Sequence, residues 1–159
     1  MRIIGIDPGF GRLGIAIIDY IQGKEVFVYS ECFETSKNDS FQARLKQIGE
    51  KISQICEEWK PESCGIESLF FEKNQKTAMN VSEARGVIVY ELLQHNVTVS
   101  DYTPLQVKIA LTGFGKAHKE QVAFMVTKIL GIESKSKIDD ELDALALAIT
   151  HGASQKKIV

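Results

Sequence analysis

A change in hydrophobic period near residue 41 limits the fold of this 159-residue chain more than any other feature. Before the change, three apolar or alternating segments are typical of strands: residues 2–7, 13–19 and 25–32. Short glycine-bearing turns separate them, which favours an antiparallel meander. After the change, apolar residues recur at spacings of 4, 3, 4 and 3 from Phe41 to Ile55, as on one face of a helix. We therefore expect three antiparallel strands, followed by a helix that ends before Pro61.

The rest of the chain alternates between the two periods. Further strands are predicted at residues 64–70 and 97–101, and further helices at 75–95, 104–111, 120–130 and 140–151. This order predicts an α/β fold, with a mixed five-stranded sheet of three antiparallel strands and then parallel strands, flanked by helices on both faces. The length suits a single domain, which we place at residues 1–152, and residues 153–159 are expected to form a flexible tail.

Composition excludes several classes of protein. With 44% hydrophobic and 25% charged residues, the chain is expected to be globular rather than disordered, collagen-like or a coiled coil. Its three cysteines show no CxxC spacing, and no membrane span or signal peptide is apparent, so we expect a soluble, cytoplasmic protein. Charge is unevenly distributed: residues 1–72 hold 8 Lys and Arg against 12 Asp and Glu, whereas residues 73–137 hold 9 against 5. Such a division suits a metal site that acts on a polyanion, although chance can also produce it.

Four acidic residues are notable because of where the pattern places them. Asp7 ends an apolar strand before Pro8-Gly9, and Glu67 interrupts a strand that otherwise appears buried. Burying a carboxylate is costly unless it is paired or holds a metal. Asp140 and Asp143 lie three residues apart on one face of the last predicted helix. Taken singly, each acid has an ordinary explanation, since a strand acid can form a salt bridge and a helix dipole favours acids at its N-terminus.

Together, the four acids suggest a metal site. If the first and fourth strands are neighbours and the last helix crosses their ends, all four carboxylates converge. No lysine or arginine stands beside them in the sequence. Oxygen ligands without histidine or cysteine favour Mg²⁺ or Mn²⁺ over zinc. Two such ions would activate a water and stabilise the leaving oxygen in phosphodiester cleavage, so the sequence favours a nuclease.

The glycine-rich segment at residues 9–14 offers two competing interpretations. It matches the GxGxxG pattern, but the following segment predicts a strand, whereas a dinucleotide site needs a helix there. A phosphate-binding hairpin of the actin and sugar-kinase type also begins with a strand that ends in Asp and a glycine-rich turn. Those proteins use two such lobes around the nucleotide, and this chain is long enough for only one.

Four motifs, in order, resemble those of the RuvC family of bacterial Holliday-junction resolvases. They are Ile4-Gly5-Ile6-Asp7-Pro8-Gly9, Ile66-Glu67 with Phe70 and Lys73-Asn74, Ala84-Arg85-Gly86-Val87, and Asp140-Glu141-Leu142-Asp143-Ala144-Leu145-Ala146. The likeness extends over about residues 1–151, so it is far more specific than any one motif. One departure is Ser68, where family members often carry glutamine. This departure concerns local DNA contacts and leaves the four acids intact.

The resemblance implies a ribonuclease H-like fold and a homodimer that resolves four-way DNA junctions by paired symmetric nicks. Two Mg²⁺ ions per subunit are expected, with Asp7 bridging them and Mn²⁺ as a substitute. The resemblance places the catalytic, metal-binding carboxylates on Asp7, Glu67, Asp140 and Asp143. It also implies that the protein works with the branch-migration proteins RuvA and RuvB.

The candidate DNA-binding residues are Phe70, Lys73, Lys108, Lys116 and Lys119. By resemblance, Phe70 lies near the junction crossover, and Lys108 and Lys119 contact DNA. From the residues alone, an exposed Phe70 would stack on an unpaired base, while Lys116 and Lys119 would neutralise phosphates. The alternatives are a packed phenylalanine and a solvated basic loop.

The predicted helix at residues 75–95 bears on the oligomeric state. Between Val87 and Leu93 it is apolar around most of its circumference, so packing on a sheet would leave part of it uncovered. Either a second subunit or other helices of the same chain would cover the rest. Two rival functions remain open, an RNA-processing nuclease of the related YqgF type and a non-catalytic junction-binding protein of the same fold. The long apolar helix argues against the first, and the four intact acids argue against the second.

Overall fold

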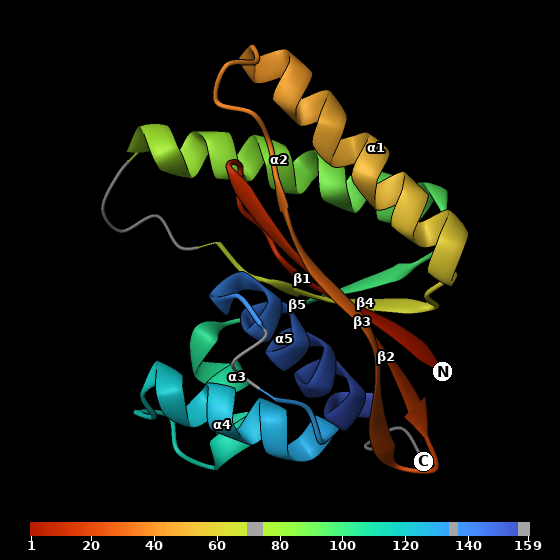
Figure 1. Ribbon diagram of the computed structural model, residues 1–159, viewed down its shortest axis with the longest axis vertical. Helices are drawn as coiled ribbons and strands as arrows, with labels where there is room; N and C mark the ends of the chain where they lie inside the picture. The colour runs from red at the N-terminus through yellow and green to blue at the C-terminus, as the bar shows by residue number, and fades with distance from the viewer. Residues whose placement is uncertain (70–74, 134–136, 156–159) are drawn as a thin grey trace.

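The computed structural model of the chain describes residues 1–69, 75–133 and 137–155 (Figure 1). The elements within these ranges are β1 (Arg2–Asp7), β2 (Arg12–Ile21), β3 (Lys24–Glu34), α1 (Phe41–Trp59), β4 (Ser63–Glu67), α2 (Gln75–Gln94), β5 (Thr98–Tyr102), α3 (Pro104–Thr112), α4 (Lys119–Leu130) and α5 (Asp139–Gln155). The strands form one sheet in the order β3-β2-β1-β4-β5. β2 is antiparallel to both its neighbours, whereas β4 is parallel to β1 and β5. The predicted mixed sheet is thus confirmed.

Two elements differ in length from the prediction. β4 ends at Glu67 rather than at residue 70, and Phe70 lies outside the described residues. α5 continues to Gln155, past its predicted end at residue 151, so residues 153–155 belong to this helix instead of the expected tail. The Ser154 hydroxyl helps to hold this last turn, because it donates to the backbone carbonyl of His151 at 2.7 Å and lies 2.8 Å from the Tyr102 hydroxyl.

Helices cover both faces of the sheet (Figure 1). The two-residue alternation of β1 sends Ile4 and Ile6 into a core with α1 and α2, whereas Ile3 joins the core around α5 on the opposite face. The even-numbered residues of β1 therefore face α1 and α2. Its odd-numbered residues, which include Gly5 and Asp7, face α5.

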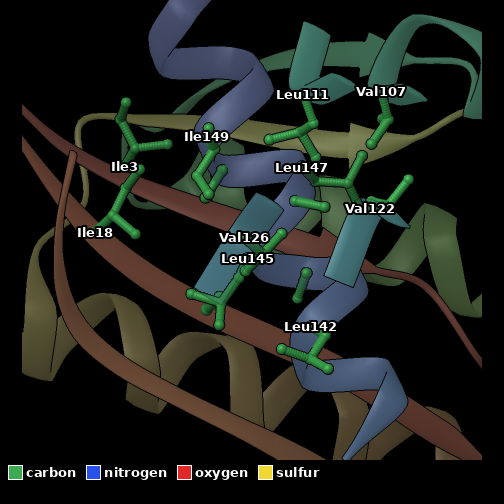
Figure 2. Packing of buried hydrophobic residues seen from close by; sticks show 14 of the residues in the cluster. Ile3, Ile18, Val107, Leu111, Val122, Val126, Leu142, Leu145, Leu147 and Ile149 are labelled. Atoms are coloured by element: carbon green, nitrogen blue, oxygen red, sulfur yellow. The ribbon is translucent and has the colours of Figure 1, made fainter. Parts of the chain in front are cut away.

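α5 is the central helix of its layer, because it lies between the sheet and the pair α3 and α4. Figure 2 shows the apolar side chains that fill this space, among them Val107 from α3, Val126 from α4 and Leu145 from α5. A helix with neighbours on both sides is apolar around most of its circumference. In α5 the residues from Leu142 to Ile149 are all buried except Asp143. This packing fixes where the acidic start of α5 lies. Within the described ranges, no helix combines the length and apolar character needed to span a membrane.

The α3–α4 connection positions a basic loop beside α5. α3 begins with a capping box, in which the Thr103 hydroxyl accepts from the Gln106 amide while the Gln106 side chain accepts from the Thr103 amide. It ends at Gly113, whose φ of 73° lies in the left-handed region that glycine adopts without strain. This turn directs the chain into the loop that carries Lys116.

Candidate active site

Asp7 and Glu67 lie at the carboxyl ends of two adjacent parallel strands. The residues before them, Ile6 of β1 and Ile66 of β4, are register partners. Both acids follow the alternation of their strands onto the face that α5 covers, like Gly5 and Gly65 two residues earlier. The condition set by the sequence, that the first and fourth strands are neighbours, is therefore met.

Glycines on three strands allow α5 to lie directly against the sheet. A Cβ atom on Gly5 would come within 2.0 Å of the Ala144 carbonyl oxygen, and one on Gly65 within 2.7 Å of the Leu147 carbonyl oxygen. Gly14 of β2 makes a similar approach one turn earlier, beside Asp140. The absence of side chains at these points lets the start of α5 reach the ends of β1 and β4.

A pocket of about 420 Å³ opens where these elements meet. Three of the four predicted acids line it: Asp7, Glu67 and Asp143. Its other polar walls come from α3, the α3–α4 loop and the start of α4: Lys108, Lys116, His118 and Lys119. Asp140 is not among the lining residues. The structure thus gathers three acids and three lysines into one cavity and leaves the fourth acid beside it.

Cations from distant parts of the chain neutralise two of the acids. Lys119 Nζ lies 2.9 Å from Asp143 Oδ2 and 3.7 Å from Asp139 Oδ2. Arg12 Nη2 lies 2.5 Å from Asp140 Oδ2. Neither ion pair follows from residues adjacent in sequence. From the sequence, Lys119 was expected only as a DNA contact, and Arg12 was not expected at the site.

The carboxyl groups in the pocket retain their protons more strongly than usual. Burial, together with the charges of Glu67, Asp143 and Asp140, raises the pKa of Asp7 to about 7. Burial and the Asp143 charge raise the pKa of Glu67. Burial also raises the pKa of Asp143, although Lys119 opposes the shift. These shifts come from burial and from repulsion between neighbouring carboxylates, and a bound cation would offset that repulsion.

The donor chemistry of this pocket fits a divalent metal ion. Within the described part of the chain, no three histidine, cysteine, aspartate or glutamate side chains are already arranged closely enough to hold a metal ion. Three carboxylates nevertheless share the cavity, and neither Asp7 nor Glu67 has an ion-pair partner among the described residues. Oxygen donors of this kind select hard cations such as Mg²⁺ and Mn²⁺.

The predicted DNA-binding residues fall into two groups. Lys108, Lys116 and Lys119 all line the pocket, although they come from α3, the following loop and α4. Phe70 and Lys73 lie outside the described residues. His118 is exposed and also lines the pocket.

Comparison with known proteins gives a match over nearly the whole chain. The family model described as "Crossover junction endodeoxyribonuclease RuvC" matches residues 3–151. A protein of that name from Fusobacterium nucleatum is 48% identical over 151 residues, which cover 95% of this chain and 80% of that protein. Another from Thermotoga maritima is 39% identical over 156 residues, which cover 98% and 93%.

Solved structures give a consistent match. The Thermus thermophilus RuvC structure superposes with a TM-score of 0.91 at 32% identity, covering 99% of this chain and 96% of that chain. The same protein in complex with Holliday junction substrate gives a TM-score of 0.90 at 30% identity, with the same coverage. The yeast mitochondrial resolvase Ydc2, at 12% identity and a TM-score of 0.73, supports the fold alone. The ribonuclease H-like fold class expected from the sequence is confirmed.

Proposed function

The chain belongs to the RuvC family of crossover junction endodeoxyribonucleases, and we propose that it cuts DNA strands at four-way junctions. Relatives of that name match it over nearly its whole length, and one of them is known in complex with a Holliday junction. The observation that carries the proposal is the pocket in which the carboxylates of Asp7, Glu67 and Asp143 lie among lysines. Such a pocket suits a reaction in which a polyanion is bound and a phosphodiester is hydrolysed at a metal.

We assign the metal site to the four predicted acids, Asp7, Glu67, Asp140 and Asp143. Two Mg²⁺ ions per subunit are proposed, with Mn²⁺ as a substitute. When bound, such ions supply Lewis-acid activation of the attacking water and neutralise charge on the leaving oxygen. The raised pKa of Asp7 supports the assignment, because its causes are burial and neighbouring carboxylates, which a cation would offset.

The basic residues of the pocket have a separate task. Lys108, Lys116 and Lys119 are proposed to hold DNA phosphates around the acidic centre, since each lines the pocket. Phe70 and Lys73 complete the proposed DNA surface by family resemblance. For Phe70→Ala we expect a cleavage defect larger than its loss of stability, and a variant that simply unfolds would favour a packed, structural phenylalanine.

A homodimer is proposed from the exposed side of α2. Met79, Tyr90 and Leu93 are about 60% exposed, and nothing lies within 4 Å of a Cβ built on Gly86. Met79, Gly86 and Leu93 recur every seven residues, and Tyr90 lies three positions before Leu93, so these residues form one stripe. A two-fold pair through this stripe would carry two identical sites for a substrate that needs two cuts. Cooperation with RuvA and RuvB is proposed by family resemblance.

The test is incubation of the purified protein with a synthetic mobile four-way junction. Paired symmetric nicks that require Mg²⁺ are expected, with little cutting of linear duplex or RNA. Asp7→Asn is the matched control, because it removes one charged ligand while leaving the lysines in place, and it should bind the junction without cutting it.

Two other outcomes would favour the rival functions. Cutting of structured RNA in preference to the junction would favour a YqgF-like RNA-processing nuclease. Tight junction binding by the unaltered protein with no cleavage under Mg²⁺ or Mn²⁺ would favour a non-catalytic junction-binding protein. Loss of both folding and binding in Asp7→Asn would show that Asp7 is a structural residue.

A further inference from the structure

The ion pair between Arg12 and Asp140 separates one acid from the other three. The same Asp140 Oδ2 atom that contacts Arg12 also accepts a hydrogen bond from the Cys32 thiol, with sulfur and oxygen 3.7 Å apart. Asp140 is therefore engaged by donors of its own chain, although its charge still acts on Asp7.

We propose that Arg12 is an internal cation that holds Asp140 until a DNA phosphate draws it away, so that substrate binding frees this carboxylate for a divalent cation. This inference rests on the proposed function. A guanidinium forms paired hydrogen bonds with either a carboxylate or a phosphate, so the two anions compete for Arg12. The metal ion and Arg12 in turn compete for Asp140.

The surroundings of Arg12 allow it to leave Asp140 without a change of fold. Its side chain is half exposed at the first residue of β2. Glu34 is its register partner on β3, and Arg12 Nε lies 3.7 Å from Glu34 Oε1, which gives the guanidinium a second carboxylate to rest against. The backbone of Asp140 is held by its close packing on Gly14. Exchange therefore requires only rotation of two side chains.

The proposed exchange also accounts for the division among the acids. Asp7, Glu67 and Asp143 share the pocket, whereas Asp140 pairs with Arg12 outside its lining. An incomplete set of ligands binds a cation more weakly than a complete one, since each carboxylate adds charge and coordination. DNA binding and metal binding would then strengthen each other through this one side chain.

The first measurement is Mn²⁺ binding to the full-length protein without DNA. Electron paramagnetic resonance detects the Mn²⁺ that remains free. Arg12→Gln is expected to bind Mn²⁺ about two- to fivefold more tightly, the range for losing a partly exposed ion pair. The matched control is Arg44→Gln, which removes the same charge nearby. Arg44 stacks on Phe10 and donates to the Thr35 hydroxyl, and no carboxylate is bonded to it within the described residues. Its Mn²⁺ affinity should equal that of the unaltered protein.

The second measurement is junction binding in EDTA at several salt concentrations. Arg12→Gln should bind more weakly, and the slope of log affinity against log salt should fall by about 0.9 if one phosphate contact is lost. Arg12→Lys keeps a positive charge and should recover most of that slope. Thermal unfolding of each variant checks that it is folded.

These measurements separate failure of the inference from failure of the proposed function. Equal Mn²⁺ affinity in Arg12→Gln and the unaltered protein, or an unchanged salt slope, would overturn the role of Arg12 while leaving junction cleavage intact. An unaltered protein that binds no Mn²⁺ and cuts no junction would overturn both.

Discussion

Gly14 and Asp140 pack so closely that a Cβ atom on Gly14 would come within 2.1 Å of the Asp140 carbonyl oxygen and 3.2 Å of the Asp7 Cβ. Gly14 is also the register partner of Asp7 in the β1–β2 hairpin. One residue without a side chain therefore sets the separation between the end of β1 and the start of α5. Two predicted metal ligands depend on that separation.

The first prediction concerns Gly14→Ala. Because the clash is with backbone rather than with a flexible side chain, the start of α5 must move away, and we expect a loss of about 3 kcal/mol in unfolding free energy, at the upper end for overpacking. Cleavage should fall further than stability alone explains. Urea unfolding and a junction-cleavage assay measure the two effects.

Gly11→Ala is the matched control for Gly14→Ala. A Cβ on Gly11 would meet only the mobile end of Arg44, at 3.4 Å, so its stability should stay within about 0.5 kcal/mol of the unaltered protein. Equal stability and activity in both variants would show that the close approach of α5 is not needed.

Much of this fold follows from local hydrophobic pattern, and the errors have physical causes. β1 and the start of α5 were predicted to within one residue because an apolar run and an acidic first turn mark them. β4 was predicted too long because residues 68–70 have no strong turn signal. Its pairing with β5 stops at Tyr102, since Thr103 caps α3, and a strand cannot continue where its partner has ended.

The candidate site was predictable in its acids and not in their counter-ions. Asp7, Glu67, Asp140 and Asp143 are visible in the sequence because acids interrupt apolar segments or open a helix. Arg12 stands far from Asp140 in the chain, and their contact arises only from the packing of α5 across β2. The available signal in the sequence was weak. It is the position of Arg12 at the start of β2, the strand that pairs antiparallel with β1 and its terminal Asp7.

The second prediction concerns stability and pH. The pKa of Asp7 is about 7 in the folded protein against 3.8 in an unperturbed chain, so the folded state binds this proton more tightly. Stability of the metal-free protein should therefore fall as pH rises from about 4 to about 7 and then level off. Asp7→Asn removes the free-energy cost of ionising this carboxyl in the folded protein. At about pH 8 the variant should therefore be more stable than the unaltered protein, by at most about 4 kcal/mol.

Urea unfolding in EDTA at about pH 4 and about pH 8 measures this difference for Asp7→Asn. The gain should vanish near pH 4, where the carboxyl is protonated in both states. Added Mg²⁺ should stabilise the unaltered protein more than the variant. If Asp7→Asn gains nothing at high pH, a cation of the protein already neutralises Asp7, and the metal assignment loses its main support.

The third prediction concerns Lys119. Its ammonium group contacts Asp143 and lines the pocket, so Lys119→Ala should weaken junction binding and lower the salt slope by about 0.9. Lys128→Ala, on the same helix, is the control, because Lys128 lies over the Phe124 ring at 5.4 Å and does not line the pocket. Salt titrations of junction affinity compare the two. Equal changes in both variants would indicate general electrostatic attraction and remove Lys119 from the interface.

The fourth prediction concerns the exposed stripe on α2. Leu93 is 58% exposed in the isolated chain, so Leu93→Glu should leave the subunit folded while placing two carboxylates face to face across a two-fold interface. We expect sedimentation analysis to change from dimer to monomer, and paired cutting to become single nicks, with little change in thermal unfolding of the subunit. Phe124→Glu, at a site on α4 that is 57% exposed, adds the same charge away from the stripe and should remain dimeric. A dimer that survives Leu93→Glu but dissociates with Phe124→Glu would move the interface from α2 to α4.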